Sequence, residues 1–287
     1  MIHREYEWNL TGKKVFAQSW SPDIPPKASI ILIHGLGEHS GRYKRWGNLF
    51  AEAGYSLTAM DLFGNGRTQG RLGHIESYQS LLDQVDLLLQ KSEENFPGVP
   101  RILYGHSMGG NVAINYAISK DPPVSGLIAT SPWLRLVIPV STIEKIFSKV
   151  ANSLVPGLRI KAKGLGAEKL SKDPEHWADV RSDSLVHRKI SARYVYEIMD
   201  KGEYALNNAN KINKPLLLMH GNADEITSHK ASKEFTTNTP DRTQLRIWEG
   251  LRHELHNELE YEEVFNYIVD WIEEIILKQD QPVPTNP

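Results

Sequence analysis

The chain has 287 residues, and 40% of them are hydrophobic, which is enough to bury a large core in one domain with or without an insertion. Its 33 Lys and Arg residues nearly balance its 35 Asp and Glu residues, and this balance argues against a nucleic-acid partner, which would favour an excess of basic residues. The absence of cysteine excludes disulfides, thiolate zinc sites and cysteine nucleophiles.

Short apolar runs alternate with segments of helical period in the first half of the chain. The apolar runs predict strands at 30–33, 55–60, 101–104 and 124–130, and the segments between them predict helices at 43–53, 77–96 and 111–119. This alternation is typical of βα units on a mostly parallel sheet.

The alternation stops between residues 132 and 210, where the sequence shows helical and irregular segments and no convincing buried strand. It resumes with predicted strands at 216–219 and 245–248 and closes with a helix from 258 to about 277. The sequence therefore predicts one α/β core formed by residues 1–131 and 211–287, with a mainly helical cap inserted at 132–210.

A glycine-flanked serine follows the third predicted strand. The segment Gly105-His106-Ser107-Met108-Gly109 has the pattern G-x-S-x-G and stands between a predicted strand and a predicted helix, which is the context of a nucleophile elbow. Such a turn strains the serine backbone and requires small residues two positions away on either side, a condition that both glycines meet. The pattern predicts Ser107 as a nucleophile, and an ordinary glycine turn is the alternative.

A serine nucleophile needs an adjacent base, and the base needs a carboxylate that orients it. When a serine stands on such an elbow, the acid and then the histidine follow it along the chain, each on a loop after a strand. Asp224 and His253 lie a few residues beyond the last two predicted strands, at the carboxyl ends where open α/β sheets carry their sites. The sequence predicts these two residues as acid and base. The rivals that it leaves open are Glu225 and Asp61 for the acid and His256 for the base.

The tetrahedral intermediate of acyl transfer needs hydrogen-bond donors for its oxyanion. One expected donor is the N–H of Met108, directly after the nucleophile, and the other is the N–H of Leu36, on the loop after the strand at 30–33. Because these are main-chain roles, the side chains of Leu36 and Met108 are expected to line the pocket. With the alternating elements, this constellation predicts an α/β-hydrolase fold with a mostly parallel central sheet flanked by helices.

Motifs for metals and nucleotides fail on their spacing. In the segment 253–257 (HELHN) the second histidine comes one residue too early for two imidazoles to share a helical face and bind zinc. Gly64, Gly66 and Gly70 miss the dinucleotide-binding spacing by one residue, and the chain contains no G-x-x-x-x-G-K-[ST] pattern. The sequence therefore predicts no cofactor and no metal.

Three segments resemble motifs of the monoacylglycerol lipase and lysophospholipase family of S33-like α/β-hydrolases. Residues 34–43 (HGLGEHSGRY) resemble its opening motif, 105–110 (GHSMGG) its nucleophile motif and 253–258 (HELHNE) its histidine motif. The first is the most specific, because a generic serine hydrolase has no reason to carry Gly-Glu-His-Ser-Gly-Arg-Tyr. The resemblance spans roughly residues 28 to 272. It implies the triad Ser107, Asp224 and His253, with Leu36 and Met108 as oxyanion donors.

The chain departs from this family in two places. Residues 61–66 (DLFGNG) replace the usual Asp-His-Arg-Gly-His-Gly, a change that is expected to affect a loop and not the chemistry. In the cap, residues 183–186 (DSLV) stand where the family usually has Asp-Pro-Leu-Val. In this family the cap selects the acyl chain, so these differences bear on the substrate more than on the reaction class.

The resemblance implies hydrolysis of a fatty-acid ester, with monoacylglycerol as the expected small lipid substrate and fatty acid and glycerol as products. The alternatives are a lysophospholipase, a broad short-chain carboxylesterase, an acyltransferase that uses an alcohol in place of water, and a non-enzymatic binding module.

The start of the cap is expected to form an amphipathic helix. Residues 141–144 (STIE) have the pattern of a capping box, and one side of the helix that they open carries Ile143, Ile146, Phe147, Val150 and Leu154. This face is expected to line an acyl tunnel, to make transient contact with a membrane surface, or to pack the cap onto the core. The charged first residues are not expected to form a signal peptide, and no apolar run approaches the roughly 18 residues that span a bilayer, so the expected location is the cytoplasm.

Overall fold

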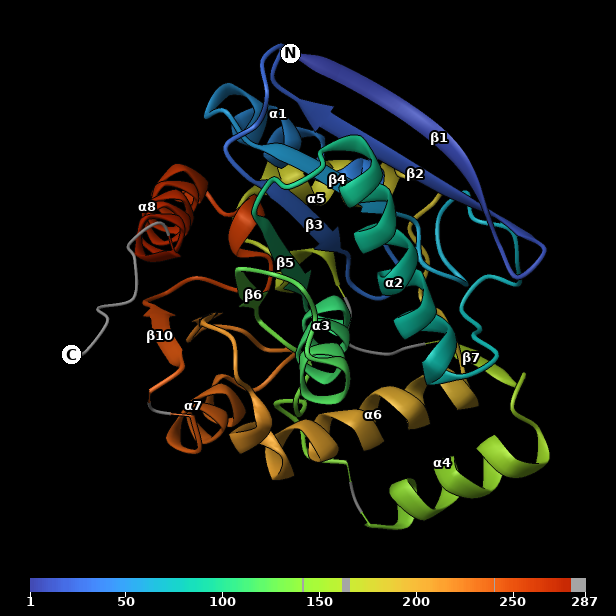
Figure 1. The fold of residues 1–287 in the computed structure, drawn as a ribbon. Coiled ribbons are helices and arrows are strands. Elements are labelled where there is room, and N and C mark those ends of the chain that lie inside the picture. The colour runs from blue at the N-terminus through green and yellow to red at the C-terminus, as the bar shows by residue number, and fades with distance from the viewer. Residues whose placement is uncertain (141, 162–165, 240, 280–287) are drawn as a thin grey trace.

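The computed structural model describes residues 1–140, 142–161, 166–239 and 241–279, with the backbone alone for 142–147, 160–161 and 277–279. An eight-stranded sheet in the order β1-β2-β4-β3-β5-β6-β9-β10 crosses the molecule (Figure 1). The strands are β1 (Ile2–Leu10), β2 (Lys13–Ser21), β3 (Ser29–Ile33), β4 (Ser56–Met60), β5 (Arg101–His106), β6 (Gly126–Thr130), β9 (Leu216–Gly221) and β10 (Thr243–Trp248). β2 pairs antiparallel with β1 and β4, and every pair from β4 to β10 is parallel.

Helices cover both faces of this sheet. The helices that pack against it are α1 (Lys44–Glu52), α2 (Tyr78–Asn95), α3 (Met108–Lys120), α7 (His229–Thr237) and α8 (Tyr261–Gln279), and α6 (Ala192–Asn207) packs on α2, α3 and α7. Side chains alternate between the two faces of a strand. In β3, Ile31 and Ile33 therefore join the cluster formed with α2, α3, α6 and α7, whereas Ile30 and Leu32 join the cluster formed with α1 and α8.

The predicted strands and helices of the core are found within a few residues of their expected bounds, and the predicted mostly parallel sheet flanked by helices is confirmed. The antiparallel hairpin of β1 and β2 was not anticipated. β1 lies at the sheet edge and has an exposed, highly charged sequence, so it lacks the apolar run that marks the central strands. The expected helix at 111–119 begins earlier, at Met108, directly after the elbow.

Between β6 and β9 the chain forms α4 (Thr142–Leu154), β7 (Arg159–Lys161), α5 (Pro174–Ser182), β8 (Lys189–Ser191) and α6, with α4 packed against α6 (Figure 1). Short 3-10 helices span Ser40–Tyr43, Ala167–Lys169, Ala209–Lys211 and Leu255–Asn257. The sequence predicts no convincing buried strand between 132 and 210, and the structure has in this interval one short antiparallel pair, β7 and β8, in which Arg159 and Lys189 are exposed. Three-residue strands are too short to show a period of two. The division into core and cap stays a prediction.

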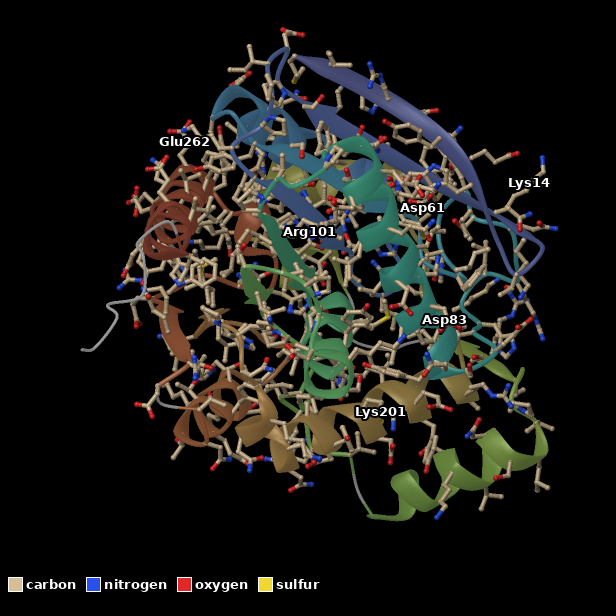
Figure 2. All side chains as sticks on the ribbon, in the orientation of Figure 1. Lys14, Asp61, Asp83, Arg101, Lys201 and Glu262 are labelled. Carbon is tan, nitrogen blue, oxygen red and sulfur yellow. The ribbon has the colours of Figure 1, made fainter. Side chains whose placement is uncertain are left out.

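Part of the expected amphipathic face of α4 lies outside the described residues. The parts that are not described are Ser141 of the capping box and the side chains of Ile143, Ile146 and Phe147. No helix in the described ranges is long and apolar enough to cross a bilayer. Charged side chains such as Lys14 and Glu262 project from the periphery of the molecule (Figure 2).

Candidate active site

Ser107 stands at the junction of β5 and α3 with a backbone φ of +54° and ψ of −115°, a conformation that L-residues rarely adopt. The turn is so tight that its two glycines have no room for side chains. A Cβ on Gly105 would lie 2.2 Å from the carbonyl oxygen of Gly109, and a Cβ on Gly109 would lie 2.0 Å from the carbonyl oxygen of Ile33. The two glycines therefore allow a strained turn that packs against the end of β3 and holds Ser107 at the end of β5.

The structure brings the three predicted residues together from the ends of β5, β9 and β10. Ser107 Oγ lies 2.9 Å from His253 Nε2, and His253 Nδ1 lies 2.7 Å from Asp224 Oδ2. Because a carboxylate can only accept, His253 donates its Nδ1 proton to Asp224, and its Nε2 is then free to accept the proton of the serine hydroxyl. All three side chains are buried. This arrangement can generate a serine nucleophile.

Asp224 is held by a set of donors that sequence reasoning missed. Its Oδ1 accepts from the N–H groups of Ile226 (2.7 Å) and Thr227 (3.0 Å), and its Oδ2 accepts from the Thr227 hydroxyl (2.8 Å). His220, fully buried at the end of β9, places its Nε2 3.0 Å from the same Oδ2 and its Nδ1 2.8 Å from Ser232 Oγ. The only sequence signal for His220 is its position four residues before the predicted acid.

These contacts determine the charge states of the pair. Burial opposes the ionisation of Asp224, but the charge of His253 and hydrogen bonds from His220 and His253 outweigh it, so the pKa of Asp224 is well below its ordinary value. Burial likewise opposes the protonation of His253, but the charge of Asp224 and its hydrogen bond raise the pKa of His253 above its ordinary value. The raised pKa means that the imidazole of His253 binds a proton more readily. A base that accepts the proton of the serine hydroxyl needs this property.

The rivals have other partners. Exposed Glu225 forms an ion pair with Lys169 (3.1 Å). Asp61 accepts from the N–H and hydroxyl of Ser40, at 2.8 and 2.6 Å, and so organises a loop. His256 stacks on a tyrosine ring, and burial holds its pKa well below the ordinary value. The structure places His253, and not His256, between the acid and the serine.

The loop at Leu36 adjoins the nucleophile, because a Cβ on Gly35 would lie 3.3 Å from Ser107 Cβ. Gly35 N–H donates to Glu38 Oε1 (2.5 Å), and Gly37 N–H donates to Asn65 Oδ1 (3.0 Å), so both neighbours of Leu36 are fixed. The departure at 61–66 was expected to affect a loop and not the chemistry, and the structure shows that its Asn65 holds the loop of the expected oxyanion donor Leu36.

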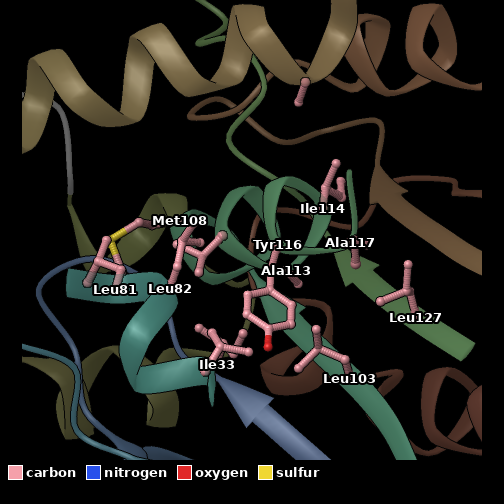
Figure 3. Close-up of a cluster of buried hydrophobic side chains, with 14 of the residues drawn as sticks. Ile33, Leu81, Leu82, Leu103, Met108, Ala113, Ile114, Tyr116, Ala117 and Leu127 are labelled. Atoms are coloured by element: carbon pink, nitrogen blue, oxygen red, sulfur yellow. The ribbon is translucent and has the colours of Figure 1, made fainter. Parts of the chain in front are cut away.

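The two expected oxyanion residues differ in their side chains. The N–H of Met108 lies in the first turn of α3, where N–H groups have no intrahelical acceptor. Leu36 lines the pocket at Ser107, as expected. The expectation that the Met108 side chain also lines it is wrong: this side chain is fully buried in the core and lies beside Leu81 and Leu82 (Figure 3). In the first turn of a helix that packs on the sheet, Met108 points toward the core.

A buried ionic network joins the Leu36 loop to the His253 loop. The Arg42 guanidinium donates to Glu38 Oε2 (2.6 Å) and to both oxygens of Glu254 (2.9 and 2.8 Å). His176 of α5 also approaches Glu254 Oε2 (2.7 Å), which ties the segment between β6 and β9 to the same network. Burial opposes the ionisation of Glu254, but the charges of Arg42 and His176 hold its pKa well below the ordinary value. Sequence reasoning missed this network, although Glu38 and Arg42 are part of the most specific motif.

Two larger cavities share lining residues with the pocket at the serine. A pocket of about 80 Å³ contains Ser107 and His253. Trp133 lines this pocket and also a cavity of about 680 Å³ between α4, α6 and α7. On another side lies a cavity of about 550 Å³ with basic residues in its lining. In the described ranges, no group of three or more His, Cys, Asp or Glu side chains is arranged to hold a metal ion.

Comparisons with known proteins agree with this geometry. The family model described as serine aminopeptidase, S33, matches residues 24–260. An abhydrolase domain-containing protein of Dictyostelium discoideum is 36% identical over 94% of the chain, and the match spans 29% of that protein's own length. Phospholipase YtpA of Bacillus subtilis is 35% identical over 86% of the chain and 95% of its own length.

Among solved structures, a soluble variant of monoglyceride lipase from Saccharomyces cerevisiae, in complex with a substrate analogue, has a TM-score of 0.86 and 26% identity. The match covers 96% of each chain. The chain therefore belongs to the serine aminopeptidase S33 family of α/β-hydrolases, is similar to the monoacylglycerol lipases within it, and is a carboxylic-ester hydrolase.

Proposed function

We propose that the chain hydrolyses monoacylglycerol to fatty acid and glycerol, with Ser107 as nucleophile, His253 as general base and acid, and Asp224 as the orienting carboxylate. The observation that carries this proposal is the continuous path of hydrogen bonds from Ser107 Oγ (2.9 Å) through His253 to Asp224 Oδ2 (2.7 Å). The similarity to a monoglyceride lipase and to a phospholipase supports a lipid ester as substrate.

The reaction has two halves. Ser107 Oγ forms a bond to the ester carbonyl carbon while His253 Nε2 takes the hydroxyl proton, and the negatively charged Asp224 stabilises the imidazolium that forms. The bond between the acyl carbon and the glycerol oxygen then breaks, and His253 gives its proton to that oxygen. Water next loses a proton to His253 and attacks the acyl carbon. Ser107 Oγ leaves, regains the proton, and the fatty acid is released.

Both transition states carry negative charge on the former carbonyl oxygen, and we assign its stabilisation to the N–H groups of Leu36 and Met108. Two features support this assignment. Glu38 and Asn65 hold the neighbours of Leu36 in place, so the loop needs little reorganisation during the reaction. Met108 opens α3, so the positive end of the helix dipole also faces the oxyanion.

The acyl chain is assigned to the cavity of about 680 Å³ beyond Trp133, whose volume lies within the range of small-molecule sites. Its lining includes the apolar side chains of Leu134, Leu136, Val137 and Met199. The adjacent helix α4 and the residues after it expose Leu154 (76%) and Leu158 (50%), which supports transient contact with a membrane surface as the source of substrate.

The proposal is tested by measuring turnover of monoacylglycerols of short, medium and long chain, a lysophosphatidylcholine and a p-nitrophenyl ester series. Ser107→Ala serves as the blank. A preference for monoacylglycerol that disappears in Ser107→Ala supports the proposal. Activity confined to short p-nitrophenyl esters would reduce the function to that of a general carboxylesterase, and wild-type turnover by Ser107→Ala would exclude Ser107 as the nucleophile.

A further inference from the structure

The path of hydrogen bonds from Ser107 through His253 does not end at Asp224. The carboxylate oxygen Oδ2 that faces His253 also lies 3.0 Å from His220 Nε2, and His220 Nδ1 lies 2.8 Å from Ser232 Oγ. The mechanism above uses neither His220 nor Ser232. We propose that His220 is a positioning residue of the reaction, whose imidazole holds Oδ2 toward His253 and shares the negative charge of this oxygen. This inference rests on the proposed roles of Ser107, His253 and Asp224.

The partners of His220 determine which of its two ring nitrogens carries the proton. Nε2 faces Asp224 Oδ2 and, at 3.1 Å, the carbonyl oxygen of Thr227, and both of these oxygens can only accept. The proton therefore lies on Nε2, and Nδ1 accepts from the hydroxyl of Ser232. A neutral imidazole in this tautomer satisfies these hydrogen bonds, so His220 donates to the carboxylate without adding a second positive charge to the site.

The imidazole of His220 is held in place by the elements around it. His220 lies in β9 and is fully buried, and α7 covers it with Ser232, which is fully buried as well. At the next residue of β9, a Cβ on Gly221 would lie 2.1 Å from the carbonyl oxygen of Leu251, so the end of this strand packs directly against the loop that carries His253. A donor fixed in this way needs no reorganisation during the reaction.

Two imidazoles share one carboxylate oxygen, because His253 Nδ1 lies 2.7 Å and His220 Nε2 lies 3.0 Å from Asp224 Oδ2. Each donor stabilises the anion of Asp224, and a better stabilised anion attracts the proton of His253 less strongly. Burial alone would lower the pKa of His253, but the charge of Asp224 outweighs burial and raises it. His220 limits this elevation. Without His220, His253 would keep its proton up to a higher pH and could not act as a base there.

Other titratable groups in the described part of the chain surround the triad without a hydrogen bond to Asp224. They are His106 on the elbow, Glu38 on the loop of Leu36, Glu225 directly after the acid, His229 on α7 and Glu254 directly after the base. Their charges act through space, and all of them remain in place when only His220 is replaced. A change in the acid limb of the pH profile (the rise of activity with pH) that follows from replacing His220 alone therefore reports its hydrogen bond to Asp224.

A pair of variants separates the donor from the space that it fills. His220→Leu removes both ring nitrogens but keeps a side chain of similar size, whereas His220→Gln keeps an N–H donor near the position of Nε2. With p-nitrophenyl butyrate, we expect His220→Leu to lower kcat about tenfold, as loss of one hydrogen bond to a charged group does, and to move the acid limb up by about one pH unit. KM should change less than about twofold, because His220 is not among the residues that line the pocket at Ser107. His220→Gln should recover most of both effects.

His229→Gln is the matched control, because it removes a half-buried imidazole whose ring lies 6.3 Å from the ring of His220, and it should keep the wild-type kcat and acid limb. A purely structural role of His220 would lower the free energy of unfolding without moving the acid limb. An unchanged acid limb in folded His220→Leu therefore overturns the inference, and so does a His220→Gln variant that behaves like His220→Leu. If Ser107→Ala abolishes turnover in that case, the proposed function stands without the inference. Wild-type turnover by Ser107→Ala would overturn both.

A measurement on the wild-type protein covers the case in which His220→Leu does not fold. Nitrogen NMR of protein with isotope-labelled histidine, at slightly alkaline pH, distinguishes protonated from unprotonated ring nitrogens. Ser232→Ala identifies the signals of His220, because it removes only the partner of Nδ1. A protonated Nε2 with an unprotonated Nδ1 supports the inference. The opposite tautomer, or a proton on both nitrogens, would overturn it, because His220 would then not be a neutral donor to Asp224.

Discussion

Replacing the orienting carboxylate, Asp224→Asn, should disable the reaction without unfolding the protein. Asn keeps an oxygen that can accept from the N–H groups of Ile226 and Thr227, at 2.7 and 3.0 Å, so the loop retains these two backbone hydrogen bonds. At the position of Oδ2, however, an amide NH₂ would face His253 Nδ1 at 2.7 Å. Two donors cannot pair, so the imidazole proton moves to Nε2, which can then no longer accept the proton of Ser107.

The expected loss in kcat is about 10⁴-fold, which corresponds to about 5.5 kcal/mol of activation free energy. The pH profile supplies a second readout. In the wild type, His253 must be unprotonated to act as a base, so activity rises with pH through a pKa that Asp224 holds above the ordinary histidine value. Removal of the carboxylate charge removes this elevation, so the acid limb of the residual activity should move to lower pH.

The assay is hydrolysis of p-nitrophenyl butyrate across the acid and neutral range, with urea unfolding as a check on the fold. Glu225→Gln is the matched control, because it removes the adjacent carboxylate, which is exposed and paired with Lys169. This variant should keep both the wild-type rate and the acid limb. The reasoning is refuted if folded Asp224→Asn loses less than about tenfold in kcat, or if its acid limb coincides with that of the wild type.

Three other changes have distinct expected outcomes. Gly109→Ala should destabilise the fold by about 1–3 kcal/mol and weaken fluorophosphonate labelling, because its Cβ would lie 2.0 Å from the carbonyl oxygen of Ile33; thermal unfolding and probe labelling measure the two effects. Glu254→Gln should cost about 3 kcal/mol in urea unfolding at neutral pH, because buried Arg42 loses a charged partner. The lowered pKa of Glu254 means that its contribution is present above the unfolded pKa and is lost as pH falls through the folded pKa, so a gap to the wild type that does not narrow in acid would contradict this account. Leu136→Trp should narrow the proposed acyl cavity and lower kcat/KM for long-chain relative to short-chain monoacylglycerols about tenfold, and a constant chain-length profile would place the acyl chain elsewhere.

Local sequence was sufficient for the central strands and the elbow. An apolar run of four to six residues has little alternative to a buried strand when a glycine turn and an amphipathic helix follow it. The elbow pattern lies within one segment, since Gly105, Ser107 and Gly109 form one turn, although the space at Gly109 is limited by the carbonyl oxygen of Ile33 on β3. The proximity of Asp224 and His253 to Ser107 could be predicted from their places after strands, because the carboxyl ends of parallel strands meet at one edge of the sheet.

Contacts between distant segments could not be predicted in this way. Whether His253 or His256 faces Ser107 depends on the geometry of one loop. The imidazole of His253 lies at Ser107, whereas the imidazole of His256, three residues later, stacks on the ring of Tyr43. The second histidine on the acid, His220, and the inward direction of the Met108 side chain have no signature in the residues beside them.

By itself, the sequence determined the α/β-hydrolase sheet and the glycine-flanked serine turn after β5, because each depends on short-range patterns that one segment carries. Only the tertiary structure decided which groups surround these residues. Arg42 and Glu254 meet across 212 positions of the chain. Such buried charges are stabilised by what the whole fold places around them, and a pattern along the chain does not contain that information.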